Sequence, residues 1–433
     1  MQRPEQKNNE MRHLTIRSLS LFSIIITIVF LSGSCKKDTS PTTLYFNSLT
    51  AGGISLMPVA APVTIPTNAT IIASMSMLIA PASANASNIL LMRSYDSSYV
   101  SLNITVKDSI ITLVPLTSLG NGISYLLSFT GLTATTGATL DYSAKTFTTI
   151  GNYAPSGLLA YWNFEGNIYD QAGTFNGNAA VDLNYNLSFN PLLGECLAFN
   201  GTSTIVEIPN GDQLMNTADF SLAFWVKANS LYHLDSLGQP KAQFVLGMGD
   251  SRGFEFEIAP DYSSCKLSAS YGLPDNTTIS EDLYFAGDGK TSANGGLPGW
   301  TYCANLTFSG GVAGLLKDKW AFITCTYDHS TKIGTIYING VKMKQQDFNL
   351  WPAGDPARNI AGMKYGGTFP QQENILALGF FHSRNSIDYS GTSWGNYYSP
   401  WANHFRGWLD ELRIFTSPLA AKDVLHMYNV TVY

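Results

Sequence analysis

Hydrophobic and polar positions alternate over short stretches along most of the chain. Residues 205–208 read Ile-Val-Glu-Ile, and residues 222–226 and 333–338 are similarly apolar or alternating, with turn residues at their ends. Runs of about four to eight such residues are typical of half-buried β-strands. Asn339 and Gly340 separate two of these runs, and both tolerate the positive φ that a two-residue type I′ hairpin requires. The pattern therefore predicts an all-β protein.

One helix is predicted, close to the C-terminus. Ser417 can cap its N-terminal end, and Pro418 suits its first position. Residues 419–428 then supply an apolar face. A single terminal helix does not change the predicted fold class.

Composition and charge narrow the range of functions. Charged residues make up 13% of the chain, against a usual value of about 25%, while aromatic residues reach 12% and glycines number 38. This profile is typical of a turn-rich protein that works outside the cytoplasm. The net charge is −6 and no basic stripe is present, which argues against a nucleic-acid partner.

The N-terminus has the pattern of an export signal. Arg12 and Arg17 precede an apolar run at 19–31, which is shorter than the roughly 20 residues that a membrane span needs. Small residues then lead to Cys35. This arrangement resembles a bacterial lipobox. Leu31 lies four residues before the cysteine rather than three, as is seen in Bacteroidetes-like lipoproteins.

These features predict a lipid-anchored protein. We expect residues 1–35 to be a lipoprotein signal peptide with its lipobox, Cys35 to become the lipidated first residue, and residues 36–43 to be a polar tether. The Lys-Lys-Asp sequence after the cysteine resembles signals that send such lipoproteins to the cell surface. The expected location is therefore the outer membrane, exposed at the cell surface. The alternative is an uncleaved membrane anchor.

Residues 155–433 contain an ordered series of motifs that resembles a known family. The motifs are GLLAYWNFEGN at 157–167, LAFNG at 197–201, FSLAFWVK at 220–227, WAFITCTYD at 320–328, TIYINGVKM at 335–343 and FRGWLDELRIF at 405–415. In this order they resemble the bacterial laminin-G-like branch of the concanavalin A-like lectin/glucanase superfamily. The resemblance implies a jelly-roll β-sandwich, a scaffold that usually binds glycans or proteins and sometimes catalyses.

A separate unit is predicted at residues 44–150. Its motifs are DSIITLVP at 108–115, LGNGISY at 119–125 and LSFTGL at 127–132. They resemble a bacterial immunoglobulin-like (Ig-like) domain, which implies an Ig-like β-sandwich. No titratable residues gather in this segment. We therefore expect a spacer that holds the outer domain away from the membrane, with a binding role as the alternative.

Aromatic residues gather in loops of the C-terminal domain that are rich in Gly, Pro, Asn and Ser. Exposed aromatic rings can stack on the apolar faces of sugars, and loops on a rigid sandwich are where function concentrates. Polar residues of the same loops can bind sugar hydroxyls. The candidate ligand-binding residues are Trp394, Trp401, Tyr397, Tyr398, Arg384, Asp388, Trp300 and Trp351, with His382 and His404 nearby. The alternative is that these loops form small cores of their own.

A Gly- and Asn-rich turn, DQAGTFNG at 170–177, suggests a metal site. Asp170 and Asn176 supply the oxygen ligands that Ca²⁺ prefers. In laminin-G-like relatives this turn lies close to the segment that matches residues 409–411, so the resemblance adds Asp410. The three residues are the candidate ligands of a structural calcium ion. The alternative is an ordinary Asx turn and a salt-bridged strand acid.

Catalysis has one candidate location. Glu255 and Glu257 lie on one face of a predicted strand, and laminarinase-like members of the superfamily carry paired acids on such a strand. Their pattern is Glu-x-Asp-x-x-Glu, whereas here Asp261 lies six residues beyond Glu255 and follows Pro260. We therefore assign no catalytic residue. The alternative is that both acids face solvent.

Four cysteines follow the predicted lipidation site. An exported chain permits disulfides, and sequence alone cannot choose among the three pairings. Cys196 and Cys325 fall in predicted core strands, where a thiol is often a small buried hydrophobe. Cys265 and Cys303 flank a Gly-, Asn- and Asp-rich insertion that a bridge would close.

The sequence thus predicts an Ig-like sandwich followed by a concanavalin A-like jelly roll. We expect a non-catalytic surface lipoprotein that binds a glycan or cell-surface polysaccharide through its laminin-G-like domain. The alternatives are a protein-adhesion module and a glycoside hydrolase.

Overall fold

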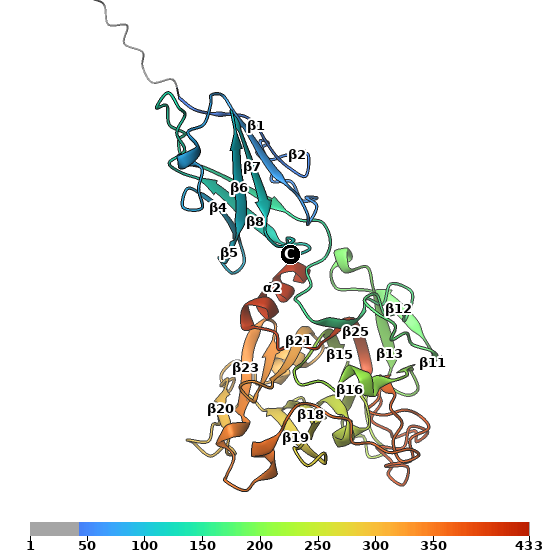
Figure 1. Cartoon of the computed structure of the whole chain (residues 1–433). Helices are drawn as coiled ribbons and strands as arrows, with labels where there is room; N and C mark the ends of the chain where they lie inside the picture. The colour runs from blue at the N-terminus through green and yellow to red at the C-terminus, as the bar shows by residue number, and fades with distance from the viewer. Residues whose placement is uncertain (1–42, 433) are drawn as a thin grey trace, which may run out of the picture. The chain divides into compact units, whose positions relative to one another are not determined.

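The computed structural model describes residues 43–432 (Figure 1). Residues from Thr43 onward form one compact unit, and nearly all of its regular structure is β-sheet. The predicted all-β fold class is confirmed. In the described part of the chain, no helix combines the length and apolar character needed to cross a bilayer. The predicted signal peptide and Cys35 lie outside the described residues.

The N-terminal sandwich pairs a five-stranded sheet, ordered β2-β1-β3-β7-β6, with a four-stranded sheet, ordered β5-β4-β8-β9. Every strand pairing in these sheets is antiparallel. The strands are β1 (Phe46–Ala51), β2 (Ile54–Ser55), β3 (Ile71–Met75), β4 (Ile89–Arg93), β5 (Tyr99–Val100), β6 (Leu102–Lys107), β7 (Ile110–Pro115), β8 (Ser124–Phe129) and β9 (Ser143–Thr148). Alternate residues of β8 are buried, which is the period that the sequence shows.

The C-terminal sandwich pairs two larger antiparallel sheets. The nine-stranded sheet is ordered β12-β13-β25-β15-β21-β22-β23-β20, with β10 paired to β25, and the seven-stranded sheet is ordered β11-β14-β24-β16-β17-β18-β19. Its first strands are β10 (Leu158–Trp162), β11 (Ala179–Val181), β12 (Asn184–Leu187), β13 (Glu195–Asn200), β14 (Ile205–Ile208), β15 (Phe220–Ala228), β16 (Gln243–Gly247) and β17 (Phe254–Ile258). The others are β18 (Cys265–Gly272), β19 (Thr278–Phe285), β20 (Trp300–Cys303), β21 (Trp320–Asp328), β22 (Ile333–Ile338), β23 (Val341–Asp347), β24 (Leu376–Leu378) and β25 (Arg406–Phe415).

Helices are few and mostly short. The α-helices are α1 (Ala313–Leu316) and α2 (Ala421–Val432). The 3-10 helices are η1 (Pro81–Ser83), η2 (Pro191–Leu193), η3 (Gly211–Leu214), η4 (Asp250–Arg252), η5 (Phe348–Leu350) and η6 (Pro356–Asn359).

The main core lies between the two large sheets. Phe224 of β15 faces Phe256 of β17 across the sandwich, with ring centroids 5.2 Å apart. Phe220 and Phe254 make a similar contact at 5.3 Å. All four side chains are fully buried. Because successive residues of a strand point to opposite faces, the residues between them lie on the outer faces of the sheets.

The predicted strands and the hairpin are confirmed. β14 and β22 begin and end where the pattern placed them, and β15 extends the predicted run at both ends. Asn339 and Gly340 connect β22 to β23 with φ of 54° and 77°. These positive angles are those of the predicted type I′ turn.

The terminal helix begins later and ends later than predicted. α2 starts at Ala421, and Ser417 does not cap it, because its hydroxyl donates to Ser156 O at 2.7 Å. The Leu419 amide donates instead to Ser221 Oγ on β15, at 3.0 Å. Tertiary contacts with the sheet therefore hold residues 417–420 outside the helix.

The cysteines of the described residues form no disulfide. The four side chains are buried free thiols, so a bridge closing the insertion between Cys265 and Cys303 is not formed. Cys303 Sγ lies 3.5 Å from Asp288 Oδ1. Cys265 is fully buried in the main core, and burial raises the pKa of its thiol to about 12. These thiols act as small core residues.

Candidate ligand-binding surface

Part of the outer face of the seven-stranded sheet, over β14, β16 and β24, is covered by residues 379–405, which we call the aromatic loop. Strand residues that point away from the main core, Ile205, Phe244 and Ala377, pack against Phe380 and Phe381 of the loop. The ring of Phe381 lies 4.7 Å from that of Phe244. The loop therefore has a small core of its own, as the alternative interpretation of the sequence had it.

Buried polar side chains fix the backbone of the aromatic loop. Both ring nitrogens of His382 lie at hydrogen-bond distance from carbonyl oxygens of the loop, at 2.7 and 3.0 Å. His404 Nε2 lies 2.9 Å from Tyr397 O, and Lys241 Nζ donates to Ala402 O at 2.6 Å. Burial lowers the pKa of His404 to about 4, so its ring is neutral at physiological pH. These histidines hold the loop rather than face a ligand.

A buried ion pair attaches the loop to the sheet. Arg384 binds Glu207 of β14 through Nη2 at 2.6 Å and Nε at 3.1 Å, and its backbone amide donates to the same carboxylate at 2.9 Å. Ser383 Oγ adds a bond to Glu207 at 3.0 Å. The Glu207 side chain is only 4% exposed. Arg384, predicted to contact ligand, is therefore engaged within the protein. Sequence reasoning missed Glu207, although a charged residue inside the apolar run Ile-Val-Glu-Ile was the available signal.

Three predicted aromatic residues keep exposed rings on this fixed loop. Tyr398 is 72% exposed, Trp401 43% and Trp394 40%. Trp394 packs one side against Tyr389, with ring centroids 5.1 Å apart. Tyr397 differs, because it is 7% exposed and its hydroxyl donates to the backbone at 2.5 Å. The structure thus leaves Trp394, Tyr398 and Trp401 as exposed residues of one loop.

The other predicted ligand contacts are engaged or lie elsewhere. Asp388 accepts bonds from Arg252 at 3.0 Å and from Gln372 at 3.2 Å. Trp300 lies on β20, at one edge of the nine-stranded sheet, and not in a loop as its surroundings in the sequence suggested. Trp351 follows η5 and is half-buried. These two tryptophans belong to a different part of the fold from the aromatic loop.

Trp300 covers an unusual lysine. Lys344 of β23 is fully buried, and its Nζ lies 3.1 Å from the centroid of the Trp300 ring. Burial lowers the pKa of Lys344 to about 8. The contact is a desolvated cation–π pair within the protein, which explains why Trp300 has little surface left for a ligand.

The acid pair lies on the outer face of β17. Glu255 is 2% exposed, while Glu257 is half-buried and lies 3.6 Å from Lys266 Nζ. Burial, followed by the charges of Glu257 and Asp250, raises the pKa of Glu255 well above its usual value. Burial and the neighbouring carboxylates therefore favour the protonated form of Glu255. Contrary to the alternative interpretation, Glu255 does not face solvent, and it does not lie in an open cleft.

The candidate calcium ligands make hydrogen bonds with N–H and O–H donors. The Asp170 carboxylate accepts three backbone amides at 2.8, 2.9 and 3.1 Å, and Asn176 Oδ1 accepts the Asp170 amide at 2.9 Å. Asp410 accepts from Ser188 Oγ at 2.5 Å and from the Glu411 amide at 2.8 Å. These oxygens act as hydrogen-bond acceptors of a turn and a strand, and the calcium site stays a prediction. Among residues 43–432, no three His, Cys, Asp or Glu side chains group closely enough to hold a metal ion.

Comparisons with known proteins agree with this architecture. The family model described as the concanavalin A-like lectin/glucanases superfamily matches residues 200–371. No curated protein sequence matches the chain.

Solved structures that match the chain include toxin binding domains. The receptor-binding domain of botulinum neurotoxin type G is 14% identical, with 64% of this chain and 51% of that chain covered and a TM-score of 0.37. The binding domain of Paraclostridial mosquitocidal protein 1 is 14% identical, with 63% and 52% covered and a TM-score of 0.40. The binding domain of botulinum neurotoxin serotype D is 15% identical, with 64% and 51% covered and a TM-score of 0.39. The aligned part spans about half the length of each of these chains.

The family match lies within the part of the chain that contains the motifs and the two large sheets. Residues 200–371 form a concanavalin A-like domain.

Proposed function

We propose that the chain is a non-catalytic, surface-anchored lipoprotein that binds carbohydrate through its concanavalin A-like domain. The N-terminal sandwich, read as an Ig-like domain, serves as the spacer, and Cys35 carries the lipid. The observation that supports carbohydrate binding is the set of exposed rings of Trp394, Tyr398 and Trp401 on the aromatic loop.

The aromatic loop suits this function because its rings are held in place before a ligand arrives. The small core beneath the loop and the Glu207–Arg384 pair fix the backbone that carries them. A fixed ring loses little conformational entropy on binding, so stacking on the apolar face of a sugar is retained as affinity.

Affinity measurements on the full chain test the proposal. A panel of soluble polysaccharides, including laminarin, mannan and xylan, is titrated by calorimetry against the parent, Tyr398→Ala and Trp401→Ala. Either substitution should weaken binding by about tenfold, or about 1.4 kcal/mol. Neither should change the unfolding midpoint by much, since both rings are substantially exposed.

Phe308→Ala is the matched control, because Phe308 is 97% exposed and lies in the segment between β20 and α1. This variant should bind like the parent. If Tyr398→Ala and Trp401→Ala also bind like the parent, the aromatic loop is not the binding surface. If no polysaccharide binds at all, the protein-adhesion alternative gains support.

A glycoside hydrolase is the second candidate function, and the raised pKa of Glu255 on the same strand face as Glu257 favours it. Glycoside hydrolysis uses one carboxyl group with a raised pKa and a second carboxylate that flank the scissile bond. A reducing-sugar assay on the same polysaccharides tests this candidate. Turnover by the parent that Glu255→Gln abolishes would replace the leading proposal, and the absence of turnover alongside binding would retain it.

The anchoring part of the proposal has its own test. Mass spectrometry of the protein extracted from membranes should find diacylglycerol on Cys35 and no residue before it. An unmodified, uncleaved N-terminus would refute the lipid anchor and leave the binding proposal intact.

A further inference from the structure

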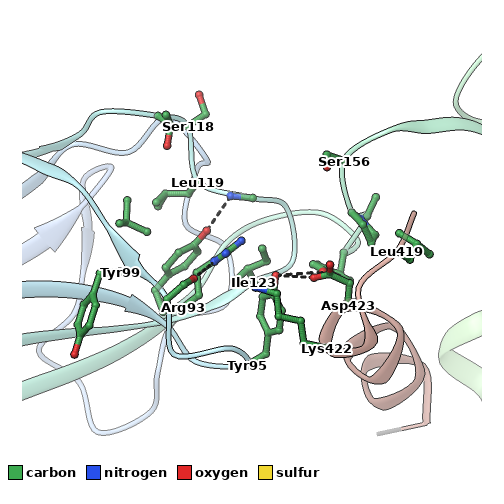
Figure 2. A pocket seen from close by; sticks show the side chains of 18 of the residues that line it. Arg93, Tyr95, Tyr99, Ser118, Leu119, Ile123, Ser156, Leu419, Lys422 and Asp423 are labelled. Atoms are coloured by element: carbon green, nitrogen blue, oxygen red, sulfur yellow. Dashed lines mark hydrogen bonds between the residues drawn. The ribbon is translucent and has the colours of Figure 1, made fainter. Parts of the chain in front are cut away.

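A cavity of about 870 Å³ lies where the N-terminal sandwich meets the C-terminal helix α2 (Figure 2). Its walls come from β5 and the segment after β7 on one side, and from residues 153–156 and 417–423 on the other. A volume of this size lies within the roughly 300–1,000 Å³ range of small-molecule sites.

Contacts between the two sandwiches build the floor of this cavity. Asp423 of α2 accepts hydrogen bonds from Tyr153 at 2.9 Å and from Tyr95 at 3.1 Å, and Figure 2 shows Asp423 and Tyr95 pointing toward each other. The ring of His426 stacks on Tyr95 at 4.2 Å and meets the edge of Tyr153 at 4.4 Å. The floor is therefore a packed aromatic cluster with a satisfied carboxylate.

The charges around the cavity compensate each other. Asp96 accepts from Arg93 at 2.8 Å and from Lys422 at 2.7 Å. Together with Asp423, these residues supply two positive and two negative charges. A charged ligand would have to break one of these pairs or enter without a counter-charge. The cavity therefore suits a neutral ligand.

Other residues that line the cavity supply apolar surface and hydroxyl groups. Tyr99 and Leu116 are each 66% exposed, although both line the cavity. The exposed side chains of Ser101, Thr117 and Ser118 also line it, and within residues 43–432 their hydroxyls make no hydrogen bond to another protein group. Hydroxyl groups can both donate and accept. A ligand that offers many hydroxyls and an apolar ring face matches this combination.

We propose that this cavity is a second carbohydrate-binding site, which takes a neutral oligosaccharide and stacks a sugar ring on Tyr99. The proposal goes beyond the aromatic loop, since it concerns a different part of the fold and rests on the cavity's own charges and hydroxyls. Because the walls belong to both sandwiches, an oligosaccharide bound there also holds the sandwiches together. The N-terminal sandwich is then part of a binding site as well as a spacer.

The test uses the full chain and four neutral probes: laminarihexaose, cellohexaose, mannohexaose and xylohexaose. Saturation-transfer NMR identifies a probe that binds, and calorimetry measures its affinity for the parent, Tyr99→Ala and Tyr142→Ala. Tyr142 is the control, because it is 70% exposed on the same sandwich and does not line the cavity. Tyr99→Ala should weaken binding by about tenfold, and Tyr142→Ala should leave it unchanged.

Tyr398→Ala, in the aromatic loop, separates this inference from the proposed function. A probe whose binding depends on Tyr99 and not on Tyr398 supports the cavity. Binding that depends on Tyr398 alone overturns the cavity and keeps the proposed function. Equal binding by Tyr99→Ala and Tyr142→Ala, or no binding of any probe, also overturns it. Asp423→Asn gives a second check, because loosening the floor should weaken the same probe while the aromatic loop still binds its polysaccharide.

Discussion

Glu207→Gln tests whether one buried carboxylate holds the aromatic loop on the sheet. The Glu207 oxygens accept four hydrogen bonds, from Ser383 Oγ and from three nitrogens of Arg384. Glutamine has nearly the same shape but carries no charge. Its amide group would also direct N–H toward an N–H donor of Arg384 whichever way it is turned.

The expected cost follows from burial and pairing. Removing one partner of a buried ion pair costs about 3–5 kcal/mol, and a hydrogen bond to a charged group contributes about 1.5–3 kcal/mol. The Arg384 side chain is 26% exposed, so water can rehydrate part of the guanidinium once its partner is neutral. We therefore expect the free energy of unfolding to fall by about 3 kcal/mol, at the low end of the range for buried pairs.

The same pair predicts a pH dependence. Burial alone would raise the pKa of Glu207, but the hydrogen bonds and charge of Arg384 lower it below its usual value. A lowered folded pKa means that the stabilisation is present above the unfolded value of about 4.3 and is lost as pH falls through the folded pKa. Parent and Glu207→Gln should therefore differ most at neutral pH and converge in acid.

Urea unfolding of the full chain, followed by tryptophan fluorescence at neutral and acid pH, measures this difference. Lys290→Ala is the control, because it breaks the exposed Lys290–Asp288 pair of 3.2 Å and should change stability by less than about 0.5 kcal/mol. Polysaccharide binding should fall along with stability in Glu207→Gln, since the loop loses its attachment. A change no larger than that of the control, or one that is independent of pH, would refute the reasoning.

Other buried groups give three more expected outcomes. Asp170→Ala should lower the free energy of unfolding by about 2–3 kcal/mol in calorimetry, because three backbone amides lose their acceptor. Thermal unfolding of the parent in excess calcium and in excess chelator tests the calcium prediction, since a bound ion must raise the unfolding midpoint. Glu255→Gln should raise the midpoint above about pH 4 and leave it unchanged below, because the raised pKa of Glu255 means that its ionisation favours unfolding; identical pH profiles for parent and variant would contradict this. The thiols of Cys196, Cys265, Cys303 and Cys325 are buried, so Ellman's reagent should detect them only after unfolding. An unfolding midpoint that falls when reductant is added would instead show a disulfide.

The strands of the C-terminal sandwich could be predicted because their signal is local. In Ile205–Ile208 and Ile333–Ile338 the apolar pattern, the turn residues and the positive φ of Asn339 are all properties of a few consecutive residues. The start of α2 could not be predicted in this way. Ser221 lies almost 200 residues before Leu419, and its hydroxyl accepts a hydrogen bond from the Leu419 amide. A helix beginning at Pro418 would leave that amide without a partner in the helix.

The partners of the candidate site residues could not be predicted, because they lie far away in the sequence. Arg384 and Asp388 have the composition of ligand contacts, yet Glu207 and Arg252 bind them. Trp300 lies among glycines in the sequence but pairs as a strand with β23. Nothing near Tyr99 in the sequence predicts a cavity, because part of the cavity's lining comes from α2 at the other end of the chain.

One signal in the sequence indicates that part of the aromatic loop fills a core. β14, β24 and β16 carry the apolar residues Ile205, Ala377 and Phe244 on their outer faces, and an apolar outer face must be covered. The aromatic loop is the segment that covers it, so most of its aromatic side chains are needed there. The exposed rings of Trp394, Tyr398 and Trp401 exceed that need. Exposed rings contribute less to folding than buried ones, although Trp394 also packs against Tyr389, and the proposal that these three rings bind a ligand rests on their exposure.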